Sequence, residues 1–174
     1  MMSHSGEFEG SMLVDGAVRS RGVRVWMSDA NLALSPPGLS RFEIILFPFN
    51  PGMVFTQSEG EIREGLSFDF KGKRLGVVSE GPLGHPGDGE YNSRNIIAFR
   101  ATTTYLPDRI AVRVEGESAS GTDYFDARKI LPPLTFSVNF DIPKERYAAF
   151  FQLKEHAHAN LLNVLGRVFP GGPM

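Results

Sequence analysis

The sequence contains no cysteine, which excludes disulfide bridges, thiolate metal ligands and a cysteine nucleophile. It also has no apolar run of 18 residues, so we expect no membrane-spanning helix. The formal net charge is only −2, with 18 basic and 20 acidic residues interspersed along the chain. Binding to a nucleic-acid backbone usually requires a basic stripe, so general nucleic-acid binding is not expected. The polar first ten residues lack the apolar core of a signal peptide, and we therefore expect a cytoplasmic location.

The 174 residues include 14 phenylalanines, 19 glycines and 12 prolines, and 41% of them are hydrophobic. This composition fits one domain, residues 1–174, with a phenylalanine-rich core. Short alternating segments between Gly/Pro turns predict antiparallel strands, because parallel strands need long crossover connections. We therefore expect a mainly β domain, an antiparallel barrel or sandwich, closed by one long C-terminal α-helix. Its predicted parts are a disordered tail (1–7), a β-rich core (8–140), the helix (141–168) and a second tail (169–174).

Three segments of the β-rich part give specific expectations. Val23, Val25 and Met27 alternate with Arg24 and Trp26, which predicts a strand with one apolar and one polar face. Residues 66–78 predict a hairpin that turns at Lys71-Gly72-Lys73. Residues 79–95 form the longest irregular stretch, and such stretches in compact domains are functional or mobile.

The period of the apolar residues changes from two to about 3.6 after Phe140, which predicts a strand followed by an amphipathic helix. Asp141 is the expected N-cap, and Pro143 is tolerated in the first turn. The apolar arc of this helix covers roughly half of its circumference, more than one core contact requires. Either a deep groove within the monomer or a sheet on one side and a partner chain on the other accounts for this width. The residues assigned to partner contact or self-association are Tyr147, Phe151, His158, Leu162 and Leu165.

No motif predicts a catalytic residue, a metal site or a cofactor. His156 and His158 point about 200° apart on a helix and cannot share a metal ion, and the zincin, nucleophile-elbow and P-loop patterns are absent. Paired carboxylates of a hydrolase meet only in space, so a hydrolase is kept as the third alternative.

The basic group Arg19, Arg21 and Arg24 is the most informative polar cluster. Arg24 and Trp26 share one strand face and Arg21 lies at its entry, and guanidinium groups bind phosphate or carboxylate and stack on planar rings. Arg21, Arg24 and Trp26 are therefore the predicted ligand-binding residues for an anion. The alternative is a solvated strand flank on which the tryptophan covers the core.

A β-barrel with arginines near its start and a C-terminal helix resembles the PilZ family, which binds cyclic di-GMP. The strand-to-helix segment FSVNFDIPKERYAAFF (136–151) is similar to the end of a PilZ domain. The family has two arginines separated by three residues, whereas Arg19, Arg21 and Arg24 are separated by one and two. Its Asp/Asn-x-Ser-x-x-Gly motif corresponds to residues 33–38, with alanine at the acidic position. The resemblance implies a cyclic dinucleotide ligand, without placing the chain in the family.

The sequence thus predicts a non-enzymatic binding or adaptor domain that acts through protein–protein contacts. The alternative is a receptor for an anionic nucleotide.

Overall fold

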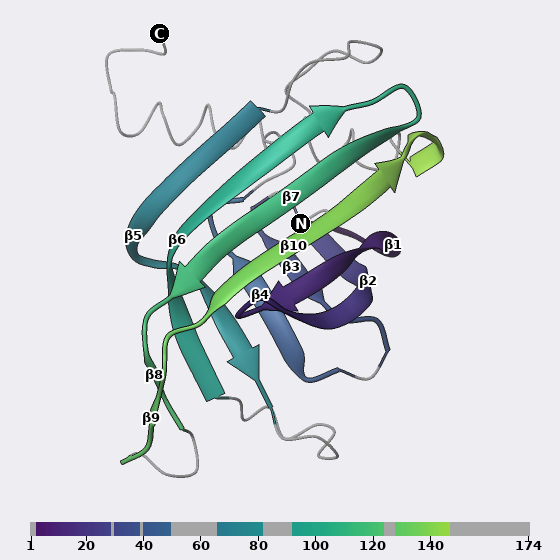
Figure 1. The fold of residues 1–174 in the computed structure, drawn as a ribbon. Helices are drawn as coiled ribbons and strands as arrows, with labels where there is room; N and C mark the ends of the chain where they lie inside the picture. Colours follow the sequence, from purple (N-terminus) through teal and green to yellow (C-terminus); the bar gives the residue numbers. More distant parts are fainter. Residues whose placement is uncertain are drawn as a thin grey trace, which may run out of the picture.

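The computed structural model describes residues 3–28, 30–38, 40–49, 66–81, 92–123 and 128–146. In this part of the chain, eight antiparallel strands form a closed barrel in the order β1-β2-β3-β4-β5-β6-β7-β10, and β10 pairs with β1 (Figure 1). The barrel strands are β1 (Ser3–Val14), β2 (Ala17–Ser28), β3 (Leu32–Ser35), β4 (Phe42–Leu46), β5 (Leu66–Glu80), β6 (Asn92–Tyr105), β7 (Arg109–Ser118) and β10 (Thr135–Pro143). The mainly β, antiparallel architecture is confirmed, and it is a barrel.

Two short strands lie outside the ring. β8 (Gly121–Thr122) pairs with β6 through Thr122 and Ser93, and β9 (Ile130–Leu131) pairs with β8. Figure 1 shows this short ladder at the lower end of the barrel. β8 and β9 therefore extend the β-structure at the end of the barrel where β5 finishes and β6 begins.

Side-chain alternation fills the barrel with a hydrophobic core. On β2, Val23, Val25 and Met27 are fully buried while Arg24 is exposed, as the alternation predicts. All eight barrel strands contribute to one buried cluster. An eight-stranded barrel is just wide enough for its interior to be filled by side chains.

The N-terminal strand begins earlier than the sequence indicated. Residues 3–7, assigned to a disordered tail, form the first part of β1 and pair with residues 24–28 of β2. The reason is tertiary, because a polar segment joins a ladder when an adjacent strand offers its backbone groups.

The hairpin expected within residues 66–78 is not formed. β5 is one strand of 15 residues, and both of its halves pair with β6. The register shifts between Lys71 and Gly76, so the residues expected to form a turn belong to a bulge instead. A continuous partner strand satisfies the backbone of both halves, which a local hairpin would not.

The last strand also extends further than expected. Asp141 is not an N-cap, because β10 continues to Pro143 and Asp141 pairs with Ala111 of β7. The Asp141 carboxylate lies 3.4 Å from Nε of Arg109. A single 3₁₀ turn, η1 (Lys144–Arg146), follows. The rest of the predicted helix, the tail 169–174 and the residues predicted for partner contact lie outside the described residues, and no helix within the described part is long and apolar enough to cross a membrane.

Candidate functional site

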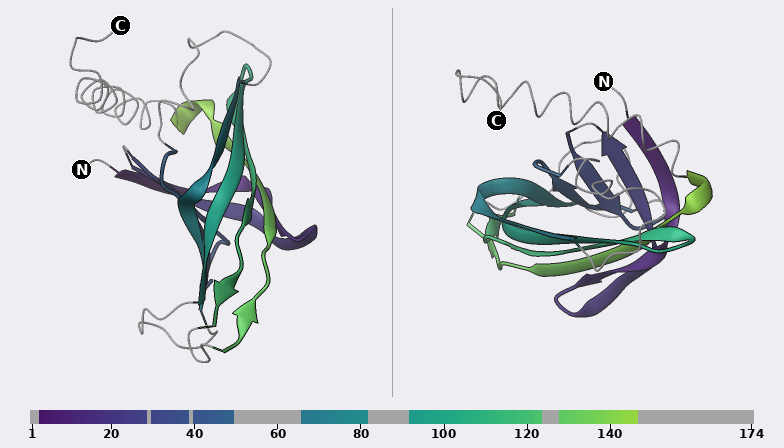
Figure 2. Two further views of the ribbon diagram at one scale, coloured as in Figure 1. Left: turned by 90° about the vertical axis from the view of Figure 1, so that its left-hand side faces the viewer. Right: turned by 90° about the horizontal axis from the view of Figure 1, so that it is seen from above.

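The tip of the β1–β2 hairpin turns over the outer face of the sheet formed by β5, β6, β7 and β10. Both views of Figure 2 show this tip beyond β10, on the side of that sheet opposite β3 and β4. Between the tip and the sheet lies a hollow of about 790 Å³, which we name the outer groove. Its lining consists of Leu13, Gly16, Asp69, Phe70, Lys71, Ala98, Phe99, Arg100, Glu115, Gly116, Glu117, Thr135, Phe136 and Ser137.

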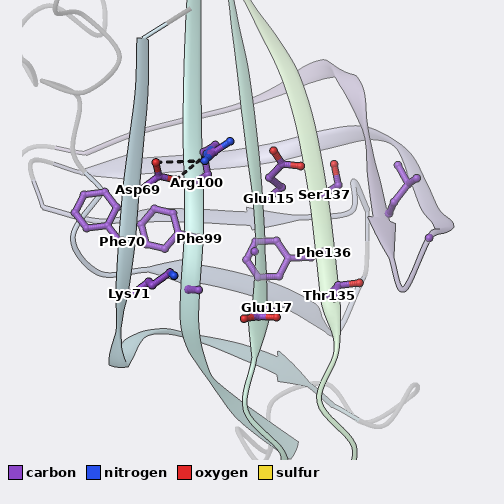
Figure 3. A pocket seen from close by; sticks show the side chains of 14 residues that line it. Asp69, Phe70, Lys71, Phe99, Arg100, Glu115, Glu117, Thr135, Phe136 and Ser137 are labelled. Atoms are coloured by element: carbon purple, nitrogen blue, oxygen red, sulfur yellow. Dashed lines mark hydrogen bonds and ion pairs between the residues drawn. The ribbon is translucent and has the colours of Figure 1, made fainter.

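Two rows of outward side chains cross the strands and form the sides of the outer groove (Figure 3). The first row is Asp69, Arg100, Glu115, Ser137 and Leu13. The second row is Lys71, Ala98, Glu117 and Thr135. Between them runs a row whose side chains face the core, so the floor between the two rows is largely backbone.

Two small residues lie at this floor: Gly116 of β7 in the core-facing row, and Ala98 of β6 in the second outward row. A Cβ added to Gly116 would lie 2.5 Å from the carbonyl oxygen of Ala98 and 2.8 Å from both Cζ of Phe136 and Cβ of Phe99, so the close backbone of β6 and the phenylalanine packing on the core side both require glycine there. Ala98 directly follows the register shift between Ile96 and Ala98. Bulges on both β5 and β6 therefore flank the lower end of the groove, and bulges commonly redirect side chains beside functional sites.

The first row carries charges that are already paired. Arg100 donates from Nε to Oδ1 of Asp69 at 2.7 Å and from Nη2 to Oδ2 at 3.4 Å. The hydrogen bond that Arg100 donates to Asp69 is the main cause that raises the pKa of Arg100, and the charge of Asp69 adds to it. Glu115 accepts from Nη2 of Arg113 at 3.4 Å. These exposed pairs hold the two carboxylates in place rather than stabilise the fold.

The second row carries two charges of opposite sign without such partners. The side chains of Lys71 and Glu117 are exposed, and neither side chain forms an ion pair or a hydrogen bond with the part of the chain that the structure describes. They lie on β5 and β7 with Ala98 between them. Two strand spacings separate their backbones by about 9.5 Å, so this side of the groove presents a cation and an anion that flank the small side chain of Ala98.

The hairpin tip is fixed to β10 by Asp15. The amide of Asp15 donates to the carbonyl of Thr135, and the amide of Thr135 donates back to the Asp15 carboxylate, both at 2.9 Å. Asp15 and Gly16 have φ of 50° and 79°, the left-handed backbone of a two-residue hairpin turn. Beside the tip, Leu13 pairs with Val18, which is 56% exposed and gives this end of the groove an apolar rim.

The three arginines near the start of the chain do not converge. Arg24 lies on the outer face of β2 and donates to Glu7 at 3.2 Å, while Trp26 is 36% exposed and pairs with Ala33 of β3. Arg21 lines a second hollow of about 490 Å³ together with two carboxylates, Glu7 and Glu9. The predicted ligand site formed by Arg21, Arg24 and Trp26 therefore contains acidic neighbours that the sequence did not indicate, and it stays a prediction.

Arg19 points to a different part of the molecule. Its Nη2 lies 3.0 Å from Oε1 of Glu80 at the end of β5, and its guanidinium lies 4.5 Å from the ring centre of Phe42. The three arginines of β2 thus lie in three different environments. A register shift between Met12 and Leu13 of β1 is the cause, because a bulge changes the direction of the side chains in this part of the hairpin.

Sequence reasoning did not single out the residues of the outer groove. Asp69 and Arg100 read as ordinary polar positions of alternating strands, Lys71 was expected in a turn, and nothing local distinguishes Glu115 or Glu117. The small residues Ala98 and Gly116 inside otherwise β-branched or aromatic strands are the available signal, because small residues in strands often mark bulges or close approaches.

Comparisons with known proteins do not indicate a function, so the functional interpretation depends on the geometry of the described residues. A scan against protein-family models, a search of curated proteins and a search of solved structures each found no match to this chain. Within the described residues, no group of three or more His, Asp or Glu side chains could hold a metal ion. The outer groove and its charges therefore carry the functional interpretation.

Proposed function

We propose that this chain is a non-enzymatic binding domain that acts through contact with another protein, and that one extended segment of the partner lies in the outer groove. The observation that carries the proposal is the pair Lys71 and Glu117, opposite charges without described partners that flank Ala98 along one side of the groove. Surface charges of this kind mainly determine which partner binds and in which register.

The chemistry of the occupant follows from this arrangement. An acidic side chain fits beside Lys71, a basic side chain fits beside Glu117, and an apolar side chain fits against Leu13 at the hairpin tip. The floor offers backbone and small side chains, so a slender segment can approach closely. The buried hydrophobic cluster inside the barrel supports the same conclusion, because the charged groups that select a partner lie on the outer surface.

The test begins with peptides of random sequence displayed on phage and selected on the full chain. The selected peptides are expected to combine an acidic, a basic and an apolar residue. Lys71→Glu and Glu117→Lys should each weaken their binding about tenfold, since one misplaced charge contact is worth about 1.4 kcal/mol. The double variant should recover affinity for a peptide whose acidic and basic residues are exchanged.

Matched controls separate the groove from general charge effects. Lys73→Glu changes an equally exposed lysine of β5 that does not line the groove, and Glu9→Lys changes an exposed glutamate of β1. Both variants should leave the affinity for the peptides within about twofold of the starting protein, because salt screens exposed charges outside the groove. Peptides that bind Lys71→Glu and Glu117→Lys as well as the starting protein, or that respond equally to the controls, would refute the proposal.

A second contact, the partner or self-association contact expected from the C-terminal segment, stays a prediction. It consists of the apolar arc that includes Phe151 and Leu162, outside the described residues. Self-association through this arc predicts a concentration-dependent mass in sedimentation, weakened by Phe151→Asp or Leu162→Asp. A strict monomer unaffected by both changes would remove this contact.

A further inference from the structure

A polar network closes the barrel at the end where β5 finishes and β6 begins. Its centre is Glu80, the last residue of β5, which pairs with Phe42 of β4 and Asn92 of β6. Two arginines approach its carboxylate from different sides. Nη2 of Arg19 lies 3.0 Å from Oε1, and Nη1 of Arg94 lies 3.9 Å from Oε2. One negative charge thus faces two positive charges.

Arg94 is the buried member of this network. It is 8% exposed on the core-facing side of β6, and its Nε donates to the carbonyl oxygen of Pro132 at 2.8 Å. Gly121 of β8 lies against its side chain, since a Cβ there would be 2.8 Å from Cγ of Arg94. Nη1 is buried and has no hydrogen bond to the described residues. A buried charged donor that lacks an acceptor is unfavourable, so the network calls for further negative charge.

Arg19 is the accessible member. Its guanidinium is held over the ring of Phe42, which is only 1% exposed and belongs to the core. The side chains of Arg19 and Glu80 are each 39% exposed, so solvent reaches both. The cation–π contact restrains the plane of the guanidinium, and an ordered guanidinium loses less freedom when it binds an oxyanion.

We propose that Arg19 and Arg94 form a binding site for a phosphate group, either the free ion or the phosphate of a small molecule, and that Glu80 occupies this site when no phosphate is bound. Phosphate supplies oxygens for both guanidiniums and for the buried Nη1 of Arg94. Glu80 is the natural competitor, because the long Nη1–Oε2 distance of 3.9 Å leaves its second oxygen poorly bound. Its exposure allows it to turn out towards water when phosphate arrives.

The test measures binding of inorganic phosphate and of phenyl phosphate to the full chain by ³¹P NMR and by thermal unfolding, against sodium chloride at equal ionic strength. At about ten times the dissociation constant, phosphate should raise the melting temperature by roughly 2–5 °C. Glu80→Gln removes the competing charge and should tighten phosphate binding about tenfold. Arg19→Gln should abolish the shift. Stronger binding of phenyl phosphate identifies a phosphate carried by a larger molecule, and equal binding identifies the free ion.

Controls and contrary results are defined by the same structure. Arg113→Gln and Glu115→Gln neutralise an exposed pair on the outer face of β7 and should leave phosphate binding unchanged. Arg19→Gln keeps the test valid if variants of the buried Arg94 do not fold. The proposal is overturned if phosphate acts no differently from chloride on the starting protein and on Glu80→Gln. A shift that survives in Arg19→Gln would also overturn it.

Discussion

Gly76 of β5 lies against the backbone of Ile45 on β4, and its replacement by alanine tests how tightly these two strands of the barrel pair. A Cβ at this position would lie 2.0 Å from the carbonyl oxygen of Ile45 and 3.1 Å from the carbonyl carbon. The first distance is at least 1.4 Å shorter than the 3.4 Å at which ordinary van der Waals contact begins. Both groups belong to the backbone, so no side-chain rotation relieves the overlap, and the strands must separate beside the pair Leu46–Gly76.

The expected loss of stability follows from that separation. Overpacking of a well-packed site costs about 1–3 kcal/mol, and each weakened backbone hydrogen bond adds about 1 kcal/mol. With two such bonds affected, Gly76→Ala should lower the free energy of unfolding by about 3–5 kcal/mol. In a chain of this length the melting temperature should fall by roughly 6–20 °C.

Urea unfolding followed by far-ultraviolet circular dichroism and by the fluorescence of Trp26 measures this loss. Gly72→Ala is the matched control on the same strand, because it makes the same chemical change where the nearest atom is the flexible end of Leu75 at 3.3 Å. It should be neutral or stabilising by up to about 1 kcal/mol, since alanine restricts the unfolded chain. If the free energy of unfolding of Gly76→Ala is less than about 1 kcal/mol below that of Gly72→Ala, β5 does not pack against the Ile45 carbonyl of β4 as closely as described.

Two further predictions concern a half-buried carboxyl and a buried hydroxyl. Burial raises the pKa of Glu43 above its ordinary value of 4.5, so the folded state binds this proton more tightly than the unfolded state and stability falls as the pH rises through the raised pKa. Glu43→Gln should therefore be more stable than the starting protein at pH 7 and lose this advantage below pH 4.5; equal urea midpoints at pH 7 would contradict the burial of this carboxyl. Ser28 Oγ accepts from the amides of Asn31 at 3.0 Å and Ala30 at 3.3 Å, so Ser28→Ala should lower the free energy of unfolding by about 1–3 kcal/mol, and a loss under about 0.5 kcal/mol in thermal unfolding would show that these amides do not depend on the serine.

Several strands could be located from the sequence because each carries its own evidence. The alternation of Val23, Val25 and Met27 with Arg24 identifies the buried face of β2 before any partner is known. The Asp15-Gly16 pair similarly marks the first hairpin, because its left-handed backbone suits few other residues. The composition alone indicated a phenylalanine-rich core, and Phe42, Phe136 and further phenylalanines are buried in the barrel.

Other assignments failed where local and tertiary signals disagree. Lys71-Gly72-Lys73 has the composition of a turn, yet the segment lies in a bulge of β5, because the residues on both sides of the bulge pair with β6. Asp141 and Pro143 have the composition of a helix start, yet β7 holds them in β10. In both places, ladder hydrogen bonds to a distant strand outweigh a local preference worth about 1 kcal/mol or less.

The amino-acid order by itself determined which face of each strand is apolar, where the first hairpin turns, and that strands would pair in antiparallel fashion. Those properties depend on neighbours one to four residues apart. The closure of the barrel, the placement of Lys71 and Glu117 on either side of Ala98 in the outer groove, and the meeting of Arg19 and Arg94 at Glu80 were decided only by the tertiary structure. They depend on the register between strands distant in sequence, and a shift of one residue would turn each of these side chains to the opposite face.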